Sequence, residues 1–299
     1  MHLHRLLAAA ATAVVTLATA PAALAASSTP PLTDGFVSVA AGGAWFPDED
    51  NSDNNEHGMS LGGAASGEYN FTSVLGFQGD LVVQSQHFEF DNDPSEDTST
   101  LRNADAALHV FYRDSSQFLY GGFVQFGTDT FSFDGDSLAS TDDRYYAGAE
   151  AQYFLGDATL YAQAGAQQVT FDGESAPGWF ATFEARYFLQ PDFKIEAHVG
   201  ANDFSTGGSD FDNVGVNSWN AGVGAEYKFA NAPFSIFAKY DFTHEDSTSF
   251  GDTDSFDDNR VLVGVKFNFG AETLEDLDRS GASLKPVSSP AFAAPSEAE

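Results

Sequence analysis

The sequence contains no cysteine and few positively charged residues. Its 299 residues include 12 Lys plus Arg against 44 Asp plus Glu, a formal net charge of −32 at pH 7. Without Cys the chain has no disulfides, thiolate metal sites, cysteine nucleophiles or lipid-modified cysteine anchor. The shortage of Lys and Arg argues against a nucleic-acid partner, because binding to phosphates requires a positive surface.

Long apolar runs are absent beyond the first 25 residues. There, Arg5 precedes an apolar run over residues 6–20, and Ala23-Leu24-Ala25 fits a signal-peptidase cleavage site. The run is short and Ala-rich for a spanning helix, which needs about 20 strongly apolar residues. We therefore predict that residues 1–25 are a cleaved signal peptide. If the mature chain enters a bilayer, it must do so as a closed barrel, in which every backbone group is paired between strands.

The sequence is rich in strict alternation of apolar and polar residues. In residues 260–269, RVLVGVKFNF, every second residue is Val or Phe. A period of two predicts a β-strand with one apolar face. Each alternating segment is close to or above the 9–11 residues that a tilted strand needs to cross a membrane. The twelve segments are 35–46, 58–70, 74–90, 101–112, 117–127, 144–155, 159–171, 178–189, 193–202, 214–229, 234–244 and 259–269.

The connections alternate between short turns and longer acidic stretches. The six longer stretches hold 25 of the 44 carboxylates and no Lys or Arg. This rhythm places all short turns at one end of the sheet, as in outer-membrane barrels. Aromatic residues are predicted near both ends, where a membrane barrel meets its two interfaces. Near the short turns these are Tyr69, Tyr112, Tyr120, Tyr153, Tyr187, Tyr227, Phe229 and Phe234; near the long stretches they are Trp45, Phe46, Phe88, Phe90, Trp179 and Trp219.

The last strand ends in the pattern Leu262-x-Gly264-x-x-Phe267-x-Phe269. Together with the architecture, this pattern resembles Gram-negative outer-membrane β-barrel proteins of the small porin-like type. The resemblance implies an all-β fold: a transmembrane antiparallel up-and-down barrel of about 12 strands over residues 35–270. It also implies outer-membrane lipid as a partner, and an insertion machinery that reads Gly264, Phe267 and Phe269. A soluble β-sandwich, which would show a similar alternation, is the alternative fold.

Two segments flank the predicted barrel. Residues 26–34 are expected to form a periplasmic lead. Residues 271–299 are rich in Ala, Ser, Pro and Glu, which predicts a flexible periplasmic tail. In the alternative, the tail folds back into the barrel mouth or contacts a periplasmic partner. A tail at this position is a departure from the family, in which the last strand normally closes the chain.

Charged residues on the polar faces are predicted to line the lumen, because a Lys or Arg facing lipid at mid-membrane costs about 2–4 kcal/mol. A basic wall is expected on the eighth to twelfth strands, opposite a more acidic wall on the second to sixth. Such walls could produce a transverse field at a constriction; alternatively, the charges pair and fill the interior. The predicted basic residues are Arg186, Lys194, Lys228, Lys239, Arg260 and Lys266, and the acidic ones are Glu68, Asp80, Asp105, Glu150, Glu184, Glu196, Glu226 and Asp241.

The function predicted from these features is a porin-like channel for passive diffusion of small hydrophilic solutes. A structural or adhesin-like barrel that acts through its loops is the alternative. We expect no enzyme activity: Ser85 and His87 share a strand and a face, but no catalytic motif surrounds them. No cofactor is expected, although the carboxylate clusters Asp48-Glu49-Asp50 and Asp252-x-Asp254 could weakly bind divalent cations.

Overall fold

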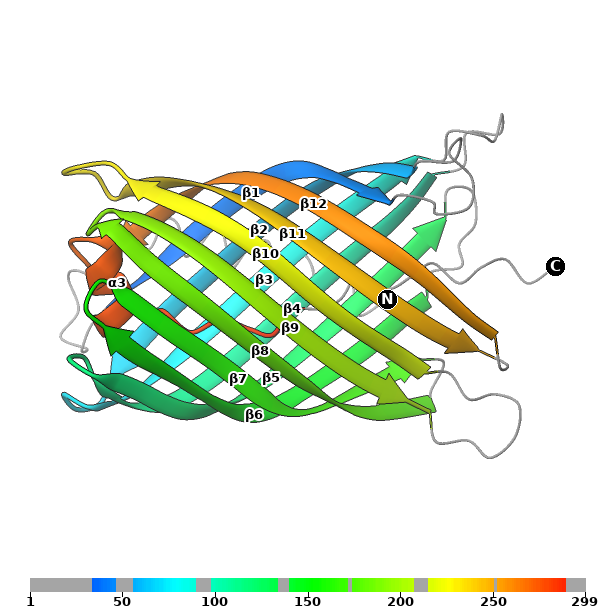
Figure 1. Ribbon diagram of the computed structural model, residues 1–299, viewed down its shortest axis with the longest axis horizontal. Coiled ribbons are helices and arrows are strands. Elements are labelled where there is room, and N and C mark those ends of the chain that lie inside the picture. Colours follow the sequence, from blue (N-terminus) through cyan, green and yellow to red (C-terminus); the bar gives the residue numbers. More distant parts are fainter. Residues whose placement is uncertain are drawn as a thin grey trace, which may run out of the picture.

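The computed structural model describes residues 34–46, 56–89, 98–133, 140–171, 174–206, 215–249 and 252–288. Twelve antiparallel strands pair in sequence order, and the first pairs with the last to close a barrel (Figure 1). The predicted fold class is therefore confirmed. The strands are β1 (Asp34–Phe46), β2 (Glu56–Asn70), β3 (Leu75–Glu89), β4 (Thr98–Asp114), β5 (Phe118–Phe133), β6 (Ser140–Leu155), β7 (Ala158–Phe171), β8 (Glu174–Gln190), β9 (Phe193–Ser205), β10 (Gly215–Lys228), β11 (Phe234–Ser249) and β12 (Asp252–Phe269).

The closing contact joins β1 to β12 in an unbroken register from Gly35 opposite Phe269 to Trp45 opposite Asn259. Every strand therefore has two neighbours, and the sheet has no open edge. The alternation of the last strand explains which side faces out. Val261, Val263 and Val265 are exposed on the outer surface at 39%, 59% and 46%. The intervening residues face the lumen.

The hairpins at the long-loop end extend further than the sequence pattern predicts. β11 and β12 remain paired up to Ser249 opposite Asp252. Beyond the apolar part of the hairpin, Ser255 Oγ donates a hydrogen bond to Asp246 at 2.5 Å. The stretch 245–258, which the sequence assigns to an acidic loop, is thus largely strand. Its Ser and Thr residues allow the strands to stay paired after the apolar alternation has ended, because β-branched and hydroxyl side chains pair well across strands.

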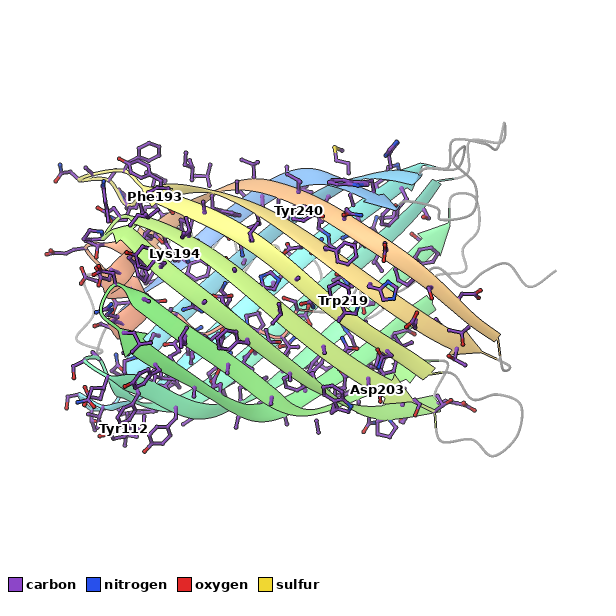
Figure 2. All side chains as sticks on the ribbon, viewed as in Figure 1. Tyr112, Phe193, Lys194, Asp203, Trp219 and Tyr240 are labelled. Carbon is purple, nitrogen blue, oxygen red and sulfur yellow. The ribbon has the colours of Figure 1, made fainter. Side chains whose placement is uncertain are left out.

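The outer surface carries aromatic side chains toward both ends of the barrel. Tyr120 and Tyr153 lie near the short turns and are about half exposed, as are Trp179 and Trp219 toward the other end. Figure 2 shows the same separation for Tyr112 and Trp219. Phe88 corrects the predicted set: it faces inward, is 6% exposed and packs against Ala44 and Leu101. Its even position in β3 places it on the lumen side, and that parity outweighs its closeness to the loop.

After β12 the chain turns back into the barrel. Gly270 has φ +88°, a conformation that glycine adopts without strain. The helix α3 (Leu274–Ser280) follows, and its N-cap residue Thr273 accepts a hydrogen bond from the backbone N–H of Asp276 at 3.0 Å. Residues 281–288, here called the inner segment, then run from α3 into the lumen (Figure 1). Within the described residues, no helix is long and apolar enough to cross a membrane.

The prediction of a flexible tail is therefore wrong for residues 271–288. The composition of these residues is that of a disordered segment, but contacts with the barrel interior order them. Residues 289–299 lie outside the described part of the chain, as do the predicted signal peptide and nearly all of the predicted N-terminal lead.

We expect the two faces of β12 to respond differently to charge. Val263→Arg, on the outer face, should lower the free energy of unfolding in lipid vesicles by about 2–4 kcal/mol, because the guanidinium would enter the hydrocarbon layer. Leu262→Arg, one residue away and facing the lumen, is the matched control and should cost at least 1 kcal/mol less, since lumen substitutions avoid the hydrocarbon layer. Urea unfolding followed by tryptophan fluorescence measures both. Equal losses would contradict the assignment of faces.

Candidate functional site

Glutamine side chains of the barrel wall bind the backbone of the inner segment. Gln78 of β3 donates from Nε2 to the Leu284 carbonyl at 2.8 Å, and its Oε1 accepts from the Leu284 N–H at 3.1 Å. Gln125 of β5 makes the same two contacts with Val287, at 3.0 and 2.7 Å. Each amide thus satisfies both backbone groups of one residue, as a neighbouring strand would. These pairs hold the inner segment extended along the wall.

Further polar contacts extend this binding along the segment. Gln152 of β6 donates to the Ser283 carbonyl at 3.3 Å, and Ser283 Oγ donates to Gln152 Oε1 at 3.1 Å. Gln163 of β7 donates to the Lys285 carbonyl at 2.8 Å. All of these glutamines are almost fully buried. Buried amides are costly unless they are hydrogen-bonded, so the wall and the inner segment satisfy each other.

Two apolar side chains anchor the same segment. Leu284 packs in a buried cluster with Phe111, Leu119 and Tyr161. Val287 packs in a second cluster, whose members are Phe123, Tyr146 and Phe180. The two anchors lie three residues apart and enter pockets built by β4 to β8. The inner segment is therefore held by its side chains as well as by its backbone.

The helix α3 is fixed at the short-turn end by charged contacts. Asp278 accepts hydrogen bonds from Arg186 Nη1 at 2.5 Å and from Thr159 Oγ1 at 2.6 Å. Lys228 Nζ donates to the Glu272 carbonyl at 2.6 Å. Arg279 donates to the Gly156 carbonyl in the turn between β6 and β7. Two of the predicted basic-wall residues, Arg186 and Lys228, thus bind the C-terminal region.

The predicted acidic residues of β2 to β6 lie inside the barrel, where each has a positively charged or protonatable partner. Glu68 pairs with Arg113 at 2.6 Å. Asp105 pairs with Arg144 at 3.2 Å. Asp80 and Glu150 flank the ring of His109, at 3.1 and 2.8 Å. The inner segment covers much of this wall, so it does not present an open acidic surface to the lumen.

Sequence reasoning left the facing of Arg113 and Arg144 open. Both are almost completely buried in this wall. Their inward facing could have been predicted from their positions in the strands. Arg113 is at an odd position of β4, like Asp105 and His109. Arg144 is at an even position of β6, like Glu150. Their positions near the strand ends obscured that parity.

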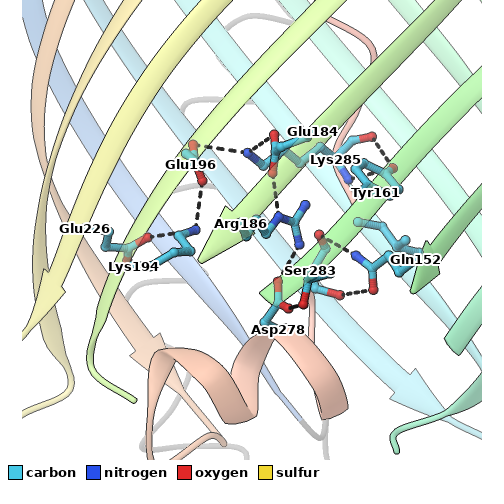
Figure 3. A network of polar contacts seen from close by, with 12 residues as sticks. Gln152, Tyr161, Glu184, Arg186, Lys194, Glu196, Glu226, Asp278, Ser283 and Lys285 are labelled. Atoms are coloured by element: carbon cyan, nitrogen blue, oxygen red, sulfur yellow. Dashed lines mark hydrogen bonds and ion pairs between the residues drawn. The ribbon is translucent and has the colours of Figure 1, made fainter. Parts of the chain in front are cut away.

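The opposite wall carries a network of alternating charges (Figure 3). Lys194 Nζ lies 3.0 Å from Glu196 and 3.5 Å from Glu226. Lys266 contacts Glu226 at 2.7 Å, and Lys239 contacts Glu196 at 3.4 Å. The strands β8 to β12 therefore bring three of the predicted basic residues, Lys194, Lys239 and Lys266, together with Glu196 and Glu226.

Lys285 of the inner segment joins this network from the other side of the lumen. Its Nζ lies 2.6 Å from Glu184 and 3.2 Å from Glu196. Burial lowers the pKa of Lys285 from its ordinary value, whereas the carboxylates of Glu184 and Glu196 act in the opposite direction. Arg186 completes the arrangement by pairing with Glu184 at 2.5 Å. The network thus spans the lumen through one residue that sequence reasoning assigned to the tail.

Lys228 and Asp241 have different partners from those their spacing indicates, whereas Arg260 pairs with a carboxylate two residues away. Lys228 lies 3.7 Å from Asp192 rather than beside Glu226. Asp241 contacts His198 at 3.4 Å. Arg260 pairs with Asp258 at 2.6 Å. A separation of two residues places charges on one face, but cross-strand neighbours then compete for them.

The predicted insertion pattern lies at the seam of the barrel. Gly264 faces inward and leaves room for the ring of Phe237, whose Cζ would lie 2.3 Å from an added Cβ. Phe267 packs edge-on against Phe234, with ring centroids 5.3 Å apart. Recognition of Gly264, Phe267 and Phe269 by an insertion machinery stays a prediction.

The remaining candidate sites are placed away from the lumen or outside the described residues. His87 lies on the outer face, where its Nδ1 is 3.1 Å from Thr100 Oγ1, and Ser85 has the same facing. The acidic residues 48–50 lie outside the described ranges. Among the described residues, no group of three or more His, Asp or Glu is placed to hold a metal ion.

A cavity of about 380 Å³ remains between the inner segment and the rest of the barrel. On one side it is lined by the small residues of β1 and β2, among them Ser38, Ala40 and Gly62. On the other side lie the charged network and Lys285. Short side chains on two adjacent strands leave space that longer ones would fill. The inner segment thus narrows the interior, and a cavity bordered by both apolar and charged side chains remains beside it.

Comparison with known proteins agrees with this architecture. Residues 156–284 match the outer membrane protein beta-barrel domain family, a range that runs from the turn before β7 into the inner segment. No curated protein matches the sequence. An outer membrane channel from Pseudomonas putida F1 has a similar structure, with a TM-score of 0.51 and 12% identity over 81% of this chain and 97% of that one. The translocator domain of the autotransporter NalP from Neisseria meningitidis has a TM-score of 0.49 and 11% sequence identity. The match covers 87% of this chain and 98% of that domain.

The glutamine contacts can be tested with a single engineered thiol, because the chain has no Cys. Ala282→Cys places a thiol where the native side chain is 3% exposed, so a bulky impermeant maleimide should react slowly. Adding Gln78→Leu and Gln125→Leu should raise the labelling rate about tenfold or more, since four hydrogen bonds of about 1 kcal/mol each are lost.

The matched control is Gln168→Leu, which removes an exposed glutamine of β7 that bonds to Ser175. It should leave the labelling rate unchanged. Fast labelling of Ala282→Cys in the otherwise native barrel would show that the inner segment does not occupy the lumen.

Proposed function

We propose that this chain, an outer-membrane β-barrel protein, is a channel for passive diffusion of small hydrophilic solutes, narrowed by its own C-terminal segment. The observation that carries the proposal is the cavity beside the inner segment, which has polar and charged side chains among its lining residues. A barrel of this strand number lies between small barrels filled by side chains and wide water-filled porins. The small lumen-facing residues of β1 and β2 leave part of the interior unfilled, as in the wider, water-filled barrels.

The polar lining supports passage of hydrated solutes. The cavity is bordered by hydroxyl and amide side chains such as Ser60, Gln84 and Asn103, in addition to the charged network. These groups can exchange hydrogen bonds with a solute or its water as it moves. Most charges of the network have an opposite charge beside them, so a neutral solute meets no large barrier from buried unpaired charges.

A second candidate function is a non-transporting structural barrel. It is favoured by the same ion pairs, which tie β8 to β12 together, and by the inner segment, which occupies part of the lumen. The two functions make opposite predictions for current across a planar bilayer. A structural barrel conducts no ions above the baseline, with or without its inner segment in place.

Loosening the inner segment should increase conductance. Leu284→Asp together with Val287→Asp places two carboxylates in aromatic pockets, where an uncompensated charge is strongly unfavourable. We expect single-channel conductance at 1 M KCl to rise by about threefold or more, since a wider lumen conducts more.

The matched control is a pair of exposed substitutions that adds the same charge. Ser115→Asp lies in the turn between β4 and β5, where the side chain is exposed. Asn231→Asp lies in the turn between β10 and β11 and is also exposed. Together they should leave conductance within about 20% of the native value, because their carboxylates stay in water. Absence of current from both the native and the loosened barrel would overturn the proposed channel.

A further inference from the structure

The charges that border the cavity are unequally exposed. Lys239 and Lys285 have side-chain exposures of 37% and 33%. Their carboxylate partners are covered: Glu196 is 6% exposed and Glu184 is 4% exposed. The network is nearly neutral in count, yet its two most exposed charged groups are these ammoniums.

The arrangement around Glu196 shows how this layering is produced. Three ammonium groups converge on this one carboxylate: Lys194 at 3.0 Å, Lys285 at 3.2 Å and Lys239 at 3.4 Å. One carboxylate carries a single negative charge, so it cannot neutralise all three. Lys194 is also shared with Glu226 and Lys285 with Glu184. Lys239 is the most exposed of the three, and its ion pair in this network is with Glu196.

The two exposed lysines belong to different elements. Lys239 projects from β11 of the barrel wall, and Lys285 comes from the inner segment. Because both contact Glu196, their ammonium groups lie close together at the border of the cavity. A small anion passing there can accept charge-assisted hydrogen bonds from both ammonium groups. The same groups would form weaker hydrogen bonds with a neutral solute.

Six carboxylates also line the cavity, namely Asp105, Glu184, Glu196, Glu226, Asp241 and Asp278. Asp241 borders the cavity with a side-chain exposure of 28%. Its Oδ1 lies 3.4 Å from Nε2 of His198. Asp105 also borders the cavity but is 8% exposed and paired with Arg144. Asp278 is held by Arg186 at 2.5 Å. None of these carboxylates matches the exposure of the two lysines.

We propose that the passage selects small anions, of the class of carboxylate- or phosphate-bearing solutes, and that Lys239 and Lys285 are the residues that contact them. The proposal rests on the channel function proposed above. In this proposal the charged groups beside the cavity determine which ions pass, and the net charge of the chain does not. The strongly acidic composition alone would indicate a preference for cations.

Reversal potentials in a planar bilayer test this assignment in the full-length protein. Under a tenfold KCl gradient, we expect the native barrel to pass chloride in preference to potassium by about threefold or more, as a positive constriction favours anions. Lys239→Gln should reduce that ratio at least twofold, and Lys239→Arg should restore it. Potassium acetate and potassium phosphate in place of KCl should keep the same sign of potential.

The control for the lost charge is Arg102→Gln. Arg102 is exposed on β4 and, by its even position, faces outward, so its removal changes net charge equally without touching the cavity. It should leave the permeability ratio unchanged. Lys285→Gln should lower the ratio as Lys239→Gln does, and total conductance measured in parallel shows whether the inner segment has also moved.

The outcomes separate the two proposals. No current through either the native or the loosened barrel removes the channel function itself. A measurable current that prefers potassium over chloride overturns the anion site and leaves the channel in place. An equal loss of selectivity in Lys239→Gln and Arg102→Gln would also overturn it, because the effect would then come from overall charge.

Discussion

Backbone pairing in hydrocarbon is the constraint on which this structure depends. A peptide group facing lipid finds no water, so each N–H and C=O must be paired within the protein. Twelve strands meet that requirement only when β1 and β12 join, and their unbroken register from Gly35 to Trp45 does so. Closure then fixes which residues face lipid and which face the lumen, since neighbours along a strand point to opposite sides.

The interior is a consequence of that closure. Lumen-facing positions carry charges and amides, and few of them are left open to water. On the wall of β3 to β7, Gln78 and Gln125 present paired donors and acceptors that match a peptide backbone. The inner segment supplies that backbone and places Leu284 and Val287 in aromatic pockets. Ordering the segment costs chain entropy, and the combined polar and apolar contacts offset that cost.

The sequence was sufficient to predict the strand number, the barrel architecture and the facing of most charged residues, because period-two alternation carries that information directly. It was insufficient to predict which charged residues pair with one another. Lys239 pairs with Glu196, two strands away in sequence, rather than with Asp241 beside it. Cross-strand register decides such contacts, and register depends on turns that a pattern of alternation does not specify.

The tail shows a different limit of sequence reasoning. Its Ala, Ser and Pro content is that of a segment with too little apolar surface to fold by itself. Leu284 and Val287 are isolated apolar residues in such a context, and nothing local distinguishes them from solvent-exposed ones. Their role becomes visible only when the pockets of β4 to β8 are formed. Composition describes what a segment can do alone, and this segment is ordered by a surface assembled elsewhere in the chain.

The inner segment also changes how the charges of the barrel should be understood. It covers the wall on which Asp80, Glu150 and their neighbours are paired, and it adds Lys285 to the opposite side. The open part of the lumen is consequently bordered by a surface that differs from the average of the chain. A net charge of −32 acts at long range in solution, whereas a solute inside the cavity responds to the nearest ammoniums. Under the proposed channel function, selectivity is therefore decided by which charges the inner segment leaves uncovered.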